Sequence, residues 1–370
     1  MTASASRRLI PIFSVFVYVS LLLTGMGEAQ TLFTDVTGQV GLDAFLGRDA
    51  RNVVFVDYDN DGFQDVFITE NRSSARRIGL FHNTGDGRLE DQTFRVPTDL
   101  HIRTGSSGSI FGDYDNDGDE DLFLPVWPHN VLLRNDRGLF TEVDAGRDLA
   151  DSLWTENALW LDYDRDGYLD LYVSSNSSSE AYAPRANRLM RNNGDGTFTD
   201  QTAVAGLDVL VNPVWGGSLG AMAAGDFNDD GWPDLFLGVF SHANRLFLSD
   251  GEGGFQDATS GDIGDVGEAF TVAVGDIDND GDLDIFQGSG NAELTSRSQM
   301  LLNLGGGEFL DVTEALGLGL ELLGINVDGA VFADIDNDGD LDLVISRATK
   351  ESGDENLLLL NDGTGMFVDQ

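Results

Sequence analysis

Short apolar runs alternate with turns rich in Asp, Asn and Gly along most of the chain. In the first repeat of this pattern, the apolar runs lie near residues 52–57, 65–69, 79–83 and 88–93. They are rich in β-branched and aromatic residues, which favour strands. The turn "NTGDGR" between the last two runs is typical of a β-hairpin. No long stretch has the 3.6-residue periodicity of an amphipathic helix, so each repeat predicts four short strands.

The same pattern occurs six times. Each copy contains an acidic loop, and the first aspartates of these loops are Asp57, Asp113, Asp162, Asp226, Asp276 and Asp334. A period of about 50–60 residues with four strands predicts an all-β fold, namely a β-propeller of four-stranded blades with six complete blades. A superhelical β-solenoid is the alternative. A single blade cannot bury its own faces, so the apolar strands should pack blade against blade.

The acidic loop lies between the first two apolar runs of each repeat, and in the first copy it reads "VDYDNDGFQD". Its acidic side chains occupy positions 1, 3, 5 and 9, which are Asp57, Asp59, Asp61 and Asp65. Alternate spacing lets three short side chains converge on one point, and Gly62 at position 6 permits a sharp turn. Ca²⁺ prefers hard oxygen ligands of this kind. Carboxylates this close together would repel one another without a cation.

Position 12 distinguishes this loop from an EF-hand. An EF-hand carries a bidentate Glu there, followed by a helix. Here position 12 is Ile68, inside the apolar run "DVFIT", so a strand should follow the loop. A solvated turn that binds nothing is the alternative for a single copy. The spacing recurs in all six copies, with Asn228 as the one substitution among the ligand positions. This repetition favours up to six calcium sites.

Residues 1–29 differ from the repeats in composition. A basic start, "MTASASRR", precedes the apolar stretch "LIPIFSVFVYVSLLL" and a small-residue segment that ends at Ala29. This pattern predicts a secretory signal peptide over 1–29, with an uncleaved anchor as the alternative, and places the propeller domain at 30–370. We therefore expect a secreted, periplasmic or cell-surface protein with no transmembrane segment after cleavage.

Composition adds two constraints. The chain has no cysteine, so bound metal rather than disulfide bonds should brace an exported fold. The formal net charge is −43, and much of the acidity belongs to the predicted metal loops. So large a negative charge argues against nucleic acid and anionic lipid as partners.

Two sets of motifs resemble a known family. "GDIDNDGDLDIF" and "ADIDNDGDLDLV" are similar to the FG-GAP/VCBS repeats of integrin α-subunit N-terminal propellers. "FTDVTGQVGL" (33–42), "FTDQTAVAGL" (198–207) and "FLDVTEALGL" (309–318) resemble the version found in secreted proteins of the cartilage acidic protein type. The resemblance covers residues 31–370. It implies a seven-bladed, calcium-binding propeller used for adhesion or recognition.

By this resemblance, calcium binds the side chains at positions 1, 3, 5 and 9 and the main-chain carbonyl at position 7. The first three loops then offer Asp57, Asp59, Asp61, Phe63 and Asp65; Asp113, Asp115, Asp117, Asp119 and Asp121; and Asp162, Asp164, Asp166, Tyr168 and Asp170. The last three loops offer Asp226, Asn228, Asp230, Trp232 and Asp234; Asp276, Asp278, Asp280, Asp282 and Asp284; and Asp334, Asp336, Asp338, Asp340 and Asp342.

Counting strands leaves one strand without partners. All six repeats have a fourth strand of their own, the last being "MFVDQ" (366–370), yet "TLFTDVT" (31–37) has the pattern of another fourth strand. Propellers often close their ring with such an N-terminal strand. We therefore expect a C-terminally truncated form of a seven-bladed protein. A six-bladed ring with one of the two strands displaced is the alternative.

The long connections between repeats and within blades are the expected ligand-binding region. In an antiparallel blade they share one face, while the acidic loops and hairpin turns share the other. Several of the scarce basic residues lie in these connections, including Arg76, Arg77 and Arg103. Varied loops on a rigid scaffold are where binding residues usually lie. We expect an extracellular protein or glycan to bind there, with plain solvated loops as the alternative.

Signatures of an enzyme are absent from the sequence. There is no thiol, and neither G-x-S-x-G nor H-E-x-x-H occurs. His82 ends a predicted third strand where other copies carry Arg134 and Arg191, so it is expected to be a surface variant. The sequence favours a non-enzymatic adhesion or recognition scaffold. A calcium-stabilised polysaccharide lyase or hydrolase, and a structural spacer in a larger surface protein, are the alternatives. The sequence identifies neither the ligand nor the oligomeric state.

Overall fold

A computed structural model gives the fold of the chain. It describes residues 35–42, 50–70, 78–97, 108–126, 129–144, 149, 154–176, 187–209, 221–264, 266–289, 297–322, 325–347 and 356–369. The predicted signal peptide lies outside these residues, as do Arg76, Arg77 and Arg103. Within the described ranges, no helix is long and apolar enough to cross a membrane.

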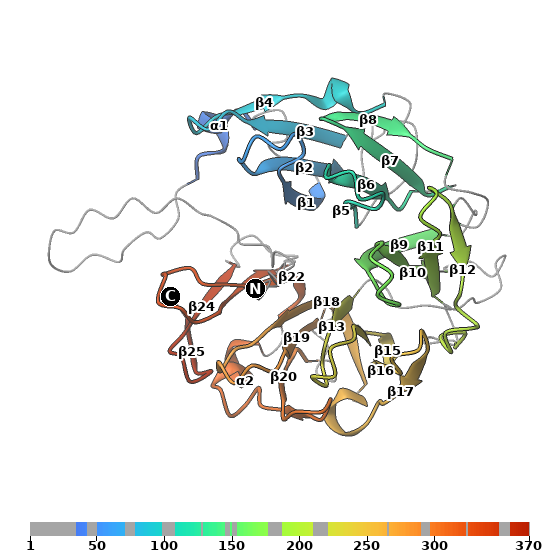
Figure 1. Cartoon of the computed structure of the whole chain (residues 1–370). Helices are drawn as coiled ribbons and strands as arrows, with labels where there is room; N and C mark the ends of the chain where they lie inside the picture. The colour runs from blue at the N-terminus through green and yellow to red at the C-terminus, as the bar shows by residue number, and fades with distance from the viewer. Residues whose placement is uncertain are drawn as a thin grey trace, which may run out of the picture.

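Six antiparallel sheets follow one another around a ring (Figure 1). The first two blades are β1 (Ala50–Val56), β2 (Asp65–Glu70), β3 (Ile78–Asn83) and β4 (Leu89–Asp91), then β5 (Ile110–Gly112), β6 (Asp121–Leu124), β7 (Val131–Asp136) and β8 (Leu139–Glu142). The third and fourth are β9 (Trp154–Leu161), β10 (Asp170–Asn176), β11 (Arg188–Asn192) and β12 (Phe198–Asp200), then β13 (Met222–Gly225), β14 (Asp234–Leu237), β16 (Arg245–Ser249) and β17 (Phe255–Asp257). The last two are β18 (Val266–Gly275), β19 (Asp284–Ser289), β20 (Gln299–Asn303) and β21 (Phe309–Asp311), then β22 (Val327–Ala333), β23 (Asp342–Arg347), β24 (Leu357–Asn361) and β25 (Phe367–Asp369).

These sheets confirm the predicted propeller of four-stranded blades. In every blade the second strand begins at position 9 of the acidic loop, so a strand, not an EF-hand helix, follows the loop. In the first blade, for example, β1 pairs with β2 from Ala50 opposite Glu70 to Val56 opposite Asp65. Figure 1 shows the first strands nearest the centre of the ring. The seventh blade stays a prediction.

One strand was not predicted. β15 (Phe240–Ala243) follows the fourth blade's second strand, yet it pairs with the next blade, which makes that sheet five-stranded. The cause is the length of β18, which at ten residues extends beyond its partner β19. Its first residues pair with β15 across an irregularity between Phe240 and His242.

The fourth strand of the first blade ends earlier than predicted. β4 stops at Asp91 because the Asp91 carboxylate accepts the N–H of Thr93 at 2.9 Å, and the chain then turns into η2 (Thr93–Arg95). Asp35 and Thr37 make the same bond at 2.9 Å, and Thr37 begins α1 (Thr37–Val40). The predicted strand over 31–37 is therefore wrong at its described end, and residues 31–34 lie outside the described part. Two other short helical turns are η4 (Gly261–Gly264) and α2 (Leu318–Glu321).

The core lies between successive blades, as predicted. In the first four acidic loops, the aromatic residue at position 2 packs against the fourth strand of the following blade. Tyr58 lies 6.1 Å from Phe140 between ring centroids, and Phe227 lies 6.0 Å from Phe309. Tyr58 and Phe227 are at most 1% exposed. Burying an aromatic side chain of this size contributes about 1.5–3 kcal/mol, so the acidic loops are anchored by the inter-blade core.

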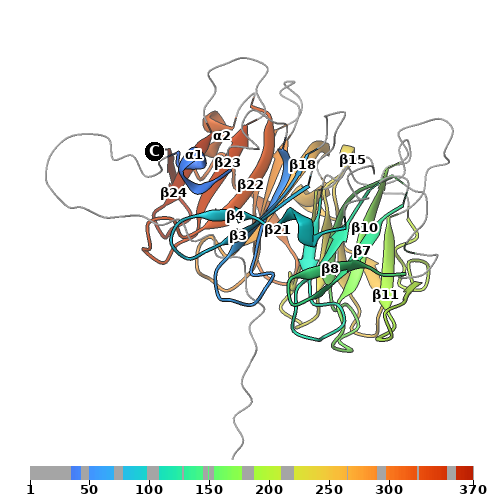
Figure 2. The same ribbon diagram turned by 90° about the horizontal axis from the view of Figure 1, so that it is seen from above.

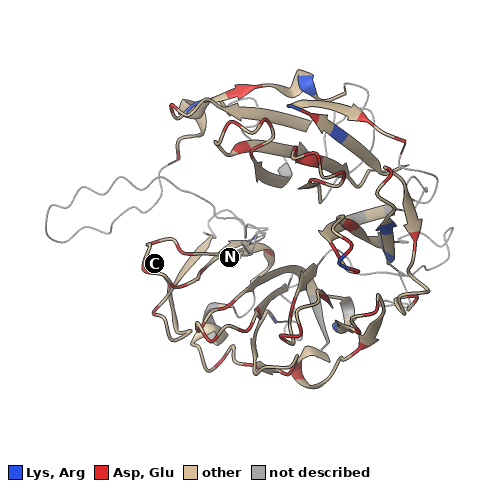
Figure 3. Ribbon diagram, viewed as in Figure 1, with Lys and Arg blue, Asp and Glu red and all other residues tan. Residues whose placement is uncertain are grey.

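The acidic loops and the hairpin turns lie at the same end of every blade because each strand is antiparallel to the next. In the edge-on view of Figure 2, these turns form the lower rim. Figure 3 shows acidic residues repeated around the ring and few basic residues in the described chain.

Candidate metal centres

The backbone of each acidic loop curls around its own carboxylates. In the first loop, Asp57 accepts the N–H groups of Asp61 at 3.0 Å and Gly62 at 2.9 Å, one on each oxygen. The equivalent bonds occur in loops two, four, five and six. The turn needs a positive φ at position 4, for example 59° at Asn60. Asn tolerates this conformation better than most residues, which explains why four loops have Asn there.

The aspartate at position 9 is fully buried in all six loops. These residues are Asp65, Asp121, Asp170, Asp234, Asp284 and Asp342. One oxygen accepts the N–H of position 2, and the other accepts an N–H near the end of the third strand. In the third loop the donors are Tyr163 at 3.2 Å and Asn192 at 2.8 Å. The aspartate at position 9 thus links the loop to its blade by hydrogen bonds, and its carboxylate is shielded from water.

Burial raises the pKa values of these carboxyl groups when no cation is present. Loss of hydration raises the pKa of Asp121 and that of Asp170 to about 8 each, and the neighbouring loop carboxylates add to the effect. The pKa of Asp284 is raised to about 7, and those of Asp65 and Asp234 to about 6. A divalent cation would reverse this balance because it stabilises the charged form.

The loop oxygens converge as the spacing predicts. One oxygen from each of three carboxylates lies within 4.8 Å of the other two in these groups: Asp57, Asp59 and Asp61; Asp113, Asp115 and Asp121; Asp162, Asp164 and Asp170; and Asp276, Asp278 and Asp284. In the fourth loop, Asn228 donates to Asp230 at 3.0 Å. An all-oxygen set on a flexible loop fits Ca²⁺, which takes about 6–8 oxygens. The structure brings these side chains together, and calcium at them stays a prediction.

The aromatic side chains at position 7 pack on the hairpin turns of their own blades. Phe63 packs on the hairpin turn of its own blade, and a Cβ added to Gly85 would lie 2.5 Å from the Phe63 ring. Tyr168 and Trp232 lie against turn glycines in the same way. Their predicted contribution to a metal site is the main-chain carbonyl, which leaves the side chain available for this packing.

An asparagine near the end of the third strand ties four of the acidic loops, namely loops one, two, four and five, to the next blade. The Asn135 side-chain amide donates to the carbonyl of Tyr58 at 2.7 Å and to that of Glu120 at 3.0 Å, and its oxygen accepts the N–H of Gly138 at 2.7 Å. The equivalent pairs are Asn192 with Tyr114, Asn303 with Phe227, and Asn361 with Ile277. In the fourth blade the position is Ser249, which has no amide N–H to donate.

We expect Asn135→Ala to lower the free energy of unfolding by about 1–3 kcal/mol, because it leaves two buried carbonyls and one N–H unsatisfied. Chemical denaturation at a saturating calcium concentration measures the change. Ser249→Ala is the matched control and should cost less, because the Ser249 hydroxyl that it removes accepts the N–H of Gly251 within its own turn, at 3.3 Å. Equal losses in the two variants would contradict the inter-blade role.

Position 4 makes a second link between neighbouring loops. The Asn60 side chain donates to the carbonyl of Gly118 at 3.1 Å and to the Asp119 carboxylate at 2.7 Å. The corresponding pairs are Asn116 with Gly167, Arg165 with Trp232, and Asn279 with Asp340. Because both loops of a pair share this contact, ordering one loop should favour order in the next.

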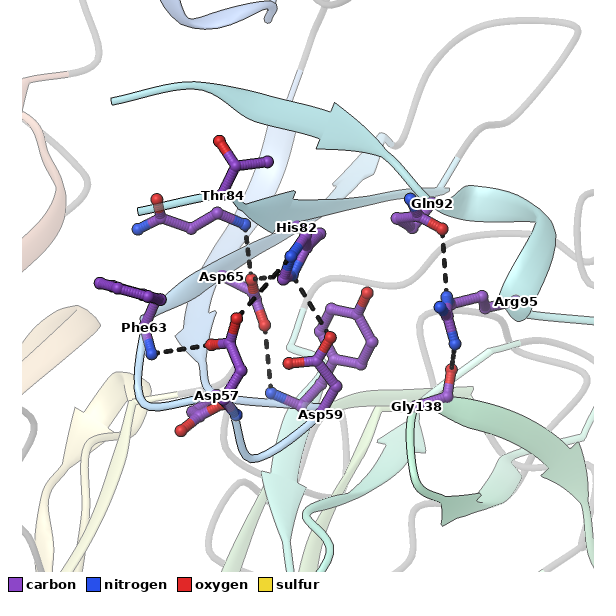
Figure 4. A network of polar contacts seen from close by, with 12 residues as sticks. Asp57, Asp59, Phe63, Asp65, His82, Thr84, Gln92, Arg95 and Gly138 are labelled. Carbon is purple, nitrogen blue, oxygen red and sulfur yellow. Dashed lines mark hydrogen bonds and ion pairs between the residues drawn. The ribbon is translucent and has the colours of Figure 1, made fainter. Parts of the chain in front are cut away.

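In the first three blades, the residue before the third-strand asparagine lies beside the acidic loop, and its type differs between blades. In the third loop, the Arg191 guanidinium pairs with Asp164 and Asp166 at 2.6 Å each. In the second loop, Arg134 instead pairs with Asp136, which is not a predicted ligand, at 2.9 Å. In the first loop, His82 lies among the carboxylates (Figure 4). The expectation that His82 is a surface variant is therefore wrong, because its side chain is only 21% exposed.

We expect Arg191→Leu to raise the calcium affinity of the third loop about fivefold. A cation must displace the guanidinium from positions 3 and 5, and a partly exposed ion pair is worth up to about 1 kcal/mol. Calorimetric calcium titration of the purified chain should show the weakest binding step strengthened. Arg134→Leu is the matched control and should leave the titration unchanged. An unchanged titration for Arg191→Leu would show that the guanidinium does not compete.

The fold and its loops define the class of protein: a β-propeller whose blades each carry an acidic, metal-type loop between the first two strands. The family model described as FG-GAP-like repeat matches residues 57–124, 162–237 and 226–286, so the chain belongs to this family.

The curated relatives that the chain matches share one name. Human Cartilage acidic protein 1 is 34% identical over 184 residues, which cover 47% of this chain and 27% of the human protein. The Xenopus tropicalis protein of that name is 34% identical over 329 residues, covering 80% of this chain and 48% of the relative. The matched region thus spans less than half of either relative.

Solved structures with a similar fold include a lectin. An Agrocybe aegerita lectin, described as recognising non-reducing terminal N-acetylglucosamine, superposes with a TM-score of 0.56 and 20% sequence identity. The superposition covers 87% of this chain and 79% of the lectin. At this identity the likeness shows the fold alone.

Proposed function

We propose that the protein is a secreted, calcium-binding propeller that acts as an adhesion or recognition scaffold. The observation that carries this proposal is the fully buried carboxylate at position 9, repeated in six blades beside further oxygen donors. A buried, unpaired carboxylate is costly, whereas one that coordinates a cation is stabilised. Calcium would therefore fix the loops to which neighbouring blades are bonded, and the calcium-loop face would serve as scaffold.

The ligand-binding region is assigned to the face opposite the acidic loops, with Arg76, Arg77 and Arg103 as candidate contacts. Because neighbouring strands are antiparallel, the described ends of β2 and β3 that flank Arg76 and Arg77 in the sequence lie opposite the acidic loop, which supports this assignment. The name of the relatives refers to cartilage, an extracellular tissue, which supports an extracellular protein or glycan as ligand. The lectin shares only the fold, and its described ligand, N-acetylglucosamine, makes glycans the first class of ligand to test. No catalytic activity appears in the names of the family or of these relatives, which favours a binder over a lyase or hydrolase.

Calcium content tests the metal half of the proposal. After equilibrium dialysis against 1 mM CaCl₂, elemental analysis of the purified chain should find several calcium ions per molecule. Less than one ion per molecule would overturn this half of the proposal.

Ligand capture tests the other half. The chain should bind particular members of glycan and matrix-protein arrays without cleaving or otherwise converting them. The triple variant Arg76→Ala, Arg77→Ala, Arg103→Ala should lose this binding at an unchanged melting temperature. Arg88→Ala, in a hairpin turn on the acidic-loop side, is the matched control. Binding that survives the triple variant would contradict the assignment of these arginines.

A further inference from the structure

The first acidic loop differs from the others in the side chain that faces its carboxylates. His82 Nδ1 lies 3.3 Å from Asp59 Oδ2 and 3.2 Å from Asp65 Oδ1, and Nε2 lies 3.8 Å from Asp61 Oδ2 (Figure 4). The equivalent third-strand residues are Arg134, Arg191, Leu248, Leu302 and Leu360. Among the six copies, only the first loop therefore has a nitrogen ligand at this position.

The geometry around Nδ1 is not that of a hydrogen-bonded ion pair. Nδ1 is buried and has no hydrogen-bond partner among the described residues. A protonated imidazole bonded to a carboxylate would have a separation of about 2.7–2.9 Å and good alignment. Arg191 does make such close contacts in the third loop, at 2.6 Å. His82 Nδ1 instead approaches two carboxylate oxygens, 3.2 and 3.3 Å away, without donating to either.

These separations match the edges of a tetrahedral metal site. Ligands bound to zinc at about 2.0–2.1 Å in tetrahedral geometry are about 3.3 Å from one another. Asp59, Asp65 and His82 each offer one atom, and these three atoms all lie within 4.8 Å of one another. Zinc accepts imidazole nitrogen and carboxylate oxygen together, whereas calcium takes oxygen.

The three side chains are held by the surrounding structure. Asp65 is fully buried and accepts the N–H of Asn83 at 2.6 Å, which fixes Oδ1 and leaves it a lone pair. The ring of His82 meets the buried ring of Tyr58 edge-on, with centroids 6.3 Å apart. Asp61, near the second ring nitrogen, occupies the place of the carboxylate that commonly orients a metal-bound histidine.

We propose that the first loop is a zinc site rather than a sixth calcium site. His82 Nδ1, Asp59 Oδ2 and Asp65 Oδ1 are its protein ligands, and solvent completes the tetrahedron. The other loops keep their oxygen ligands and remain calcium sites under the proposed function. The metal choice of the first loop does not depend on calcium filling the others.

Metal content in a mixed buffer tests the proposal. The purified chain is dialysed against 1 mM CaCl₂ and 10 μM ZnCl₂, and both metals are measured in the same sample. We expect one zinc per chain in the wild type, and a zinc affinity lowered by roughly 100-fold or more in His82→Leu, because loss of a ligand should exceed the effect of losing a second-shell partner. His242→Gln removes an imidazole from β15, outside the acidic loops, and should retain the zinc.

Three results distinguish a failure of the proposed zinc site from a failure of the proposed calcium sites. Zinc that persists in His82→Leu, or its absence from the wild type, overturns the zinc site whatever the calcium content. His82→Leu should keep its calcium, because leucine occupies this position in three other blades. Co²⁺ added in place of zinc should give the intense visible absorption of a four-coordinate ion in the wild type. A weak, octahedral-type spectrum would contradict the tetrahedral ligand set.

Discussion

Removing calcium should lower the midpoint of thermal unfolding by about 15 °C. A site with a dissociation constant of about 10⁻⁴ M, within the range of extracellular calcium modules, contributes about 1.4 kcal/mol at 1 mM calcium. The five loops other than the first contribute about 7 kcal/mol together, and a chain of this size loses about 2 °C per kcal/mol. The effect should be cooperative because loops one, two, four and five are each bonded to the following blade, as Tyr58 of the first loop is to Asn135.

Scanning calorimetry with 1 mM calcium and with excess chelator measures this difference. Adding back calcium should restore the midpoint, whereas an equal concentration of magnesium should restore much less, because Mg²⁺ demands near-ideal octahedral geometry and sheds water reluctantly. Asp117→Asn, which changes one predicted ligand in the second loop, should reduce the calcium-dependent increment without abolishing it. If chelation left the unfolding midpoint unchanged, the hypothesis that bound metal stabilises the fold would be refuted.

The sequence predicted the fold well because its signals are local. The apolar residue at position 12, such as Ile68, indicated a strand after each loop, and β2 begins at Asp65. The hairpin turns and their glycines placed the last two strands of each blade. The position 9 acids were expected to be ligands, and their complete burial in the structure strengthens that expectation. Each of these features depends on residues fewer than fifteen positions apart.

The features that the sequence did not reveal depend on contacts between distant positions. Asn135 and Tyr58 are 77 residues apart, so a turn-forming asparagine could not be distinguished from an inter-blade donor. Arg191 lies 25 residues from Asp166, and His82 is likewise separated from the first loop by a whole strand. One signal was available: the residue before that asparagine always falls on the same face of the third strand. Aligning the six copies on the asparagine would have placed His82 and Arg191 over their loops.

Chelated protein should lose stability as the pH rises from 5 to 8, whereas calcium-loaded protein should not. Without a cation, the pKa values of Asp121 and Asp170 are raised to about 8, and that of Asp284 to about 7, because burial removes hydration. In the unfolded chain these groups ionise near pH 4. The folded state therefore binds more protons throughout this interval, and stability falls with pH by about 1.4 kcal/mol per unit for each retained proton. Calcium requires the ionised groups, so protons compete with it and the calcium-loaded state gains relative stability as pH rises.

Melting temperatures of metal-stripped and calcium-saturated protein, taken at each pH from 5 to 8, should thus diverge. The quantity to compare is the slope of melting temperature against pH in the stripped protein. Asp170→Asn removes one titrating group and should flatten this slope. The hydrogen bond that the variant also loses lowers the melting temperature without restoring that titration. Asp86→Asn is the matched control: a side-chain bond from Thr84 lowers the pKa of Asp86, so this group is ionised in both states above pH 5 and the variant should keep the wild-type slope. If the metal-stripped protein became more stable as the pH rose, the position 9 carboxylates would be ionised without metal. The electrostatic argument for a cation beside these carboxylates would then fail.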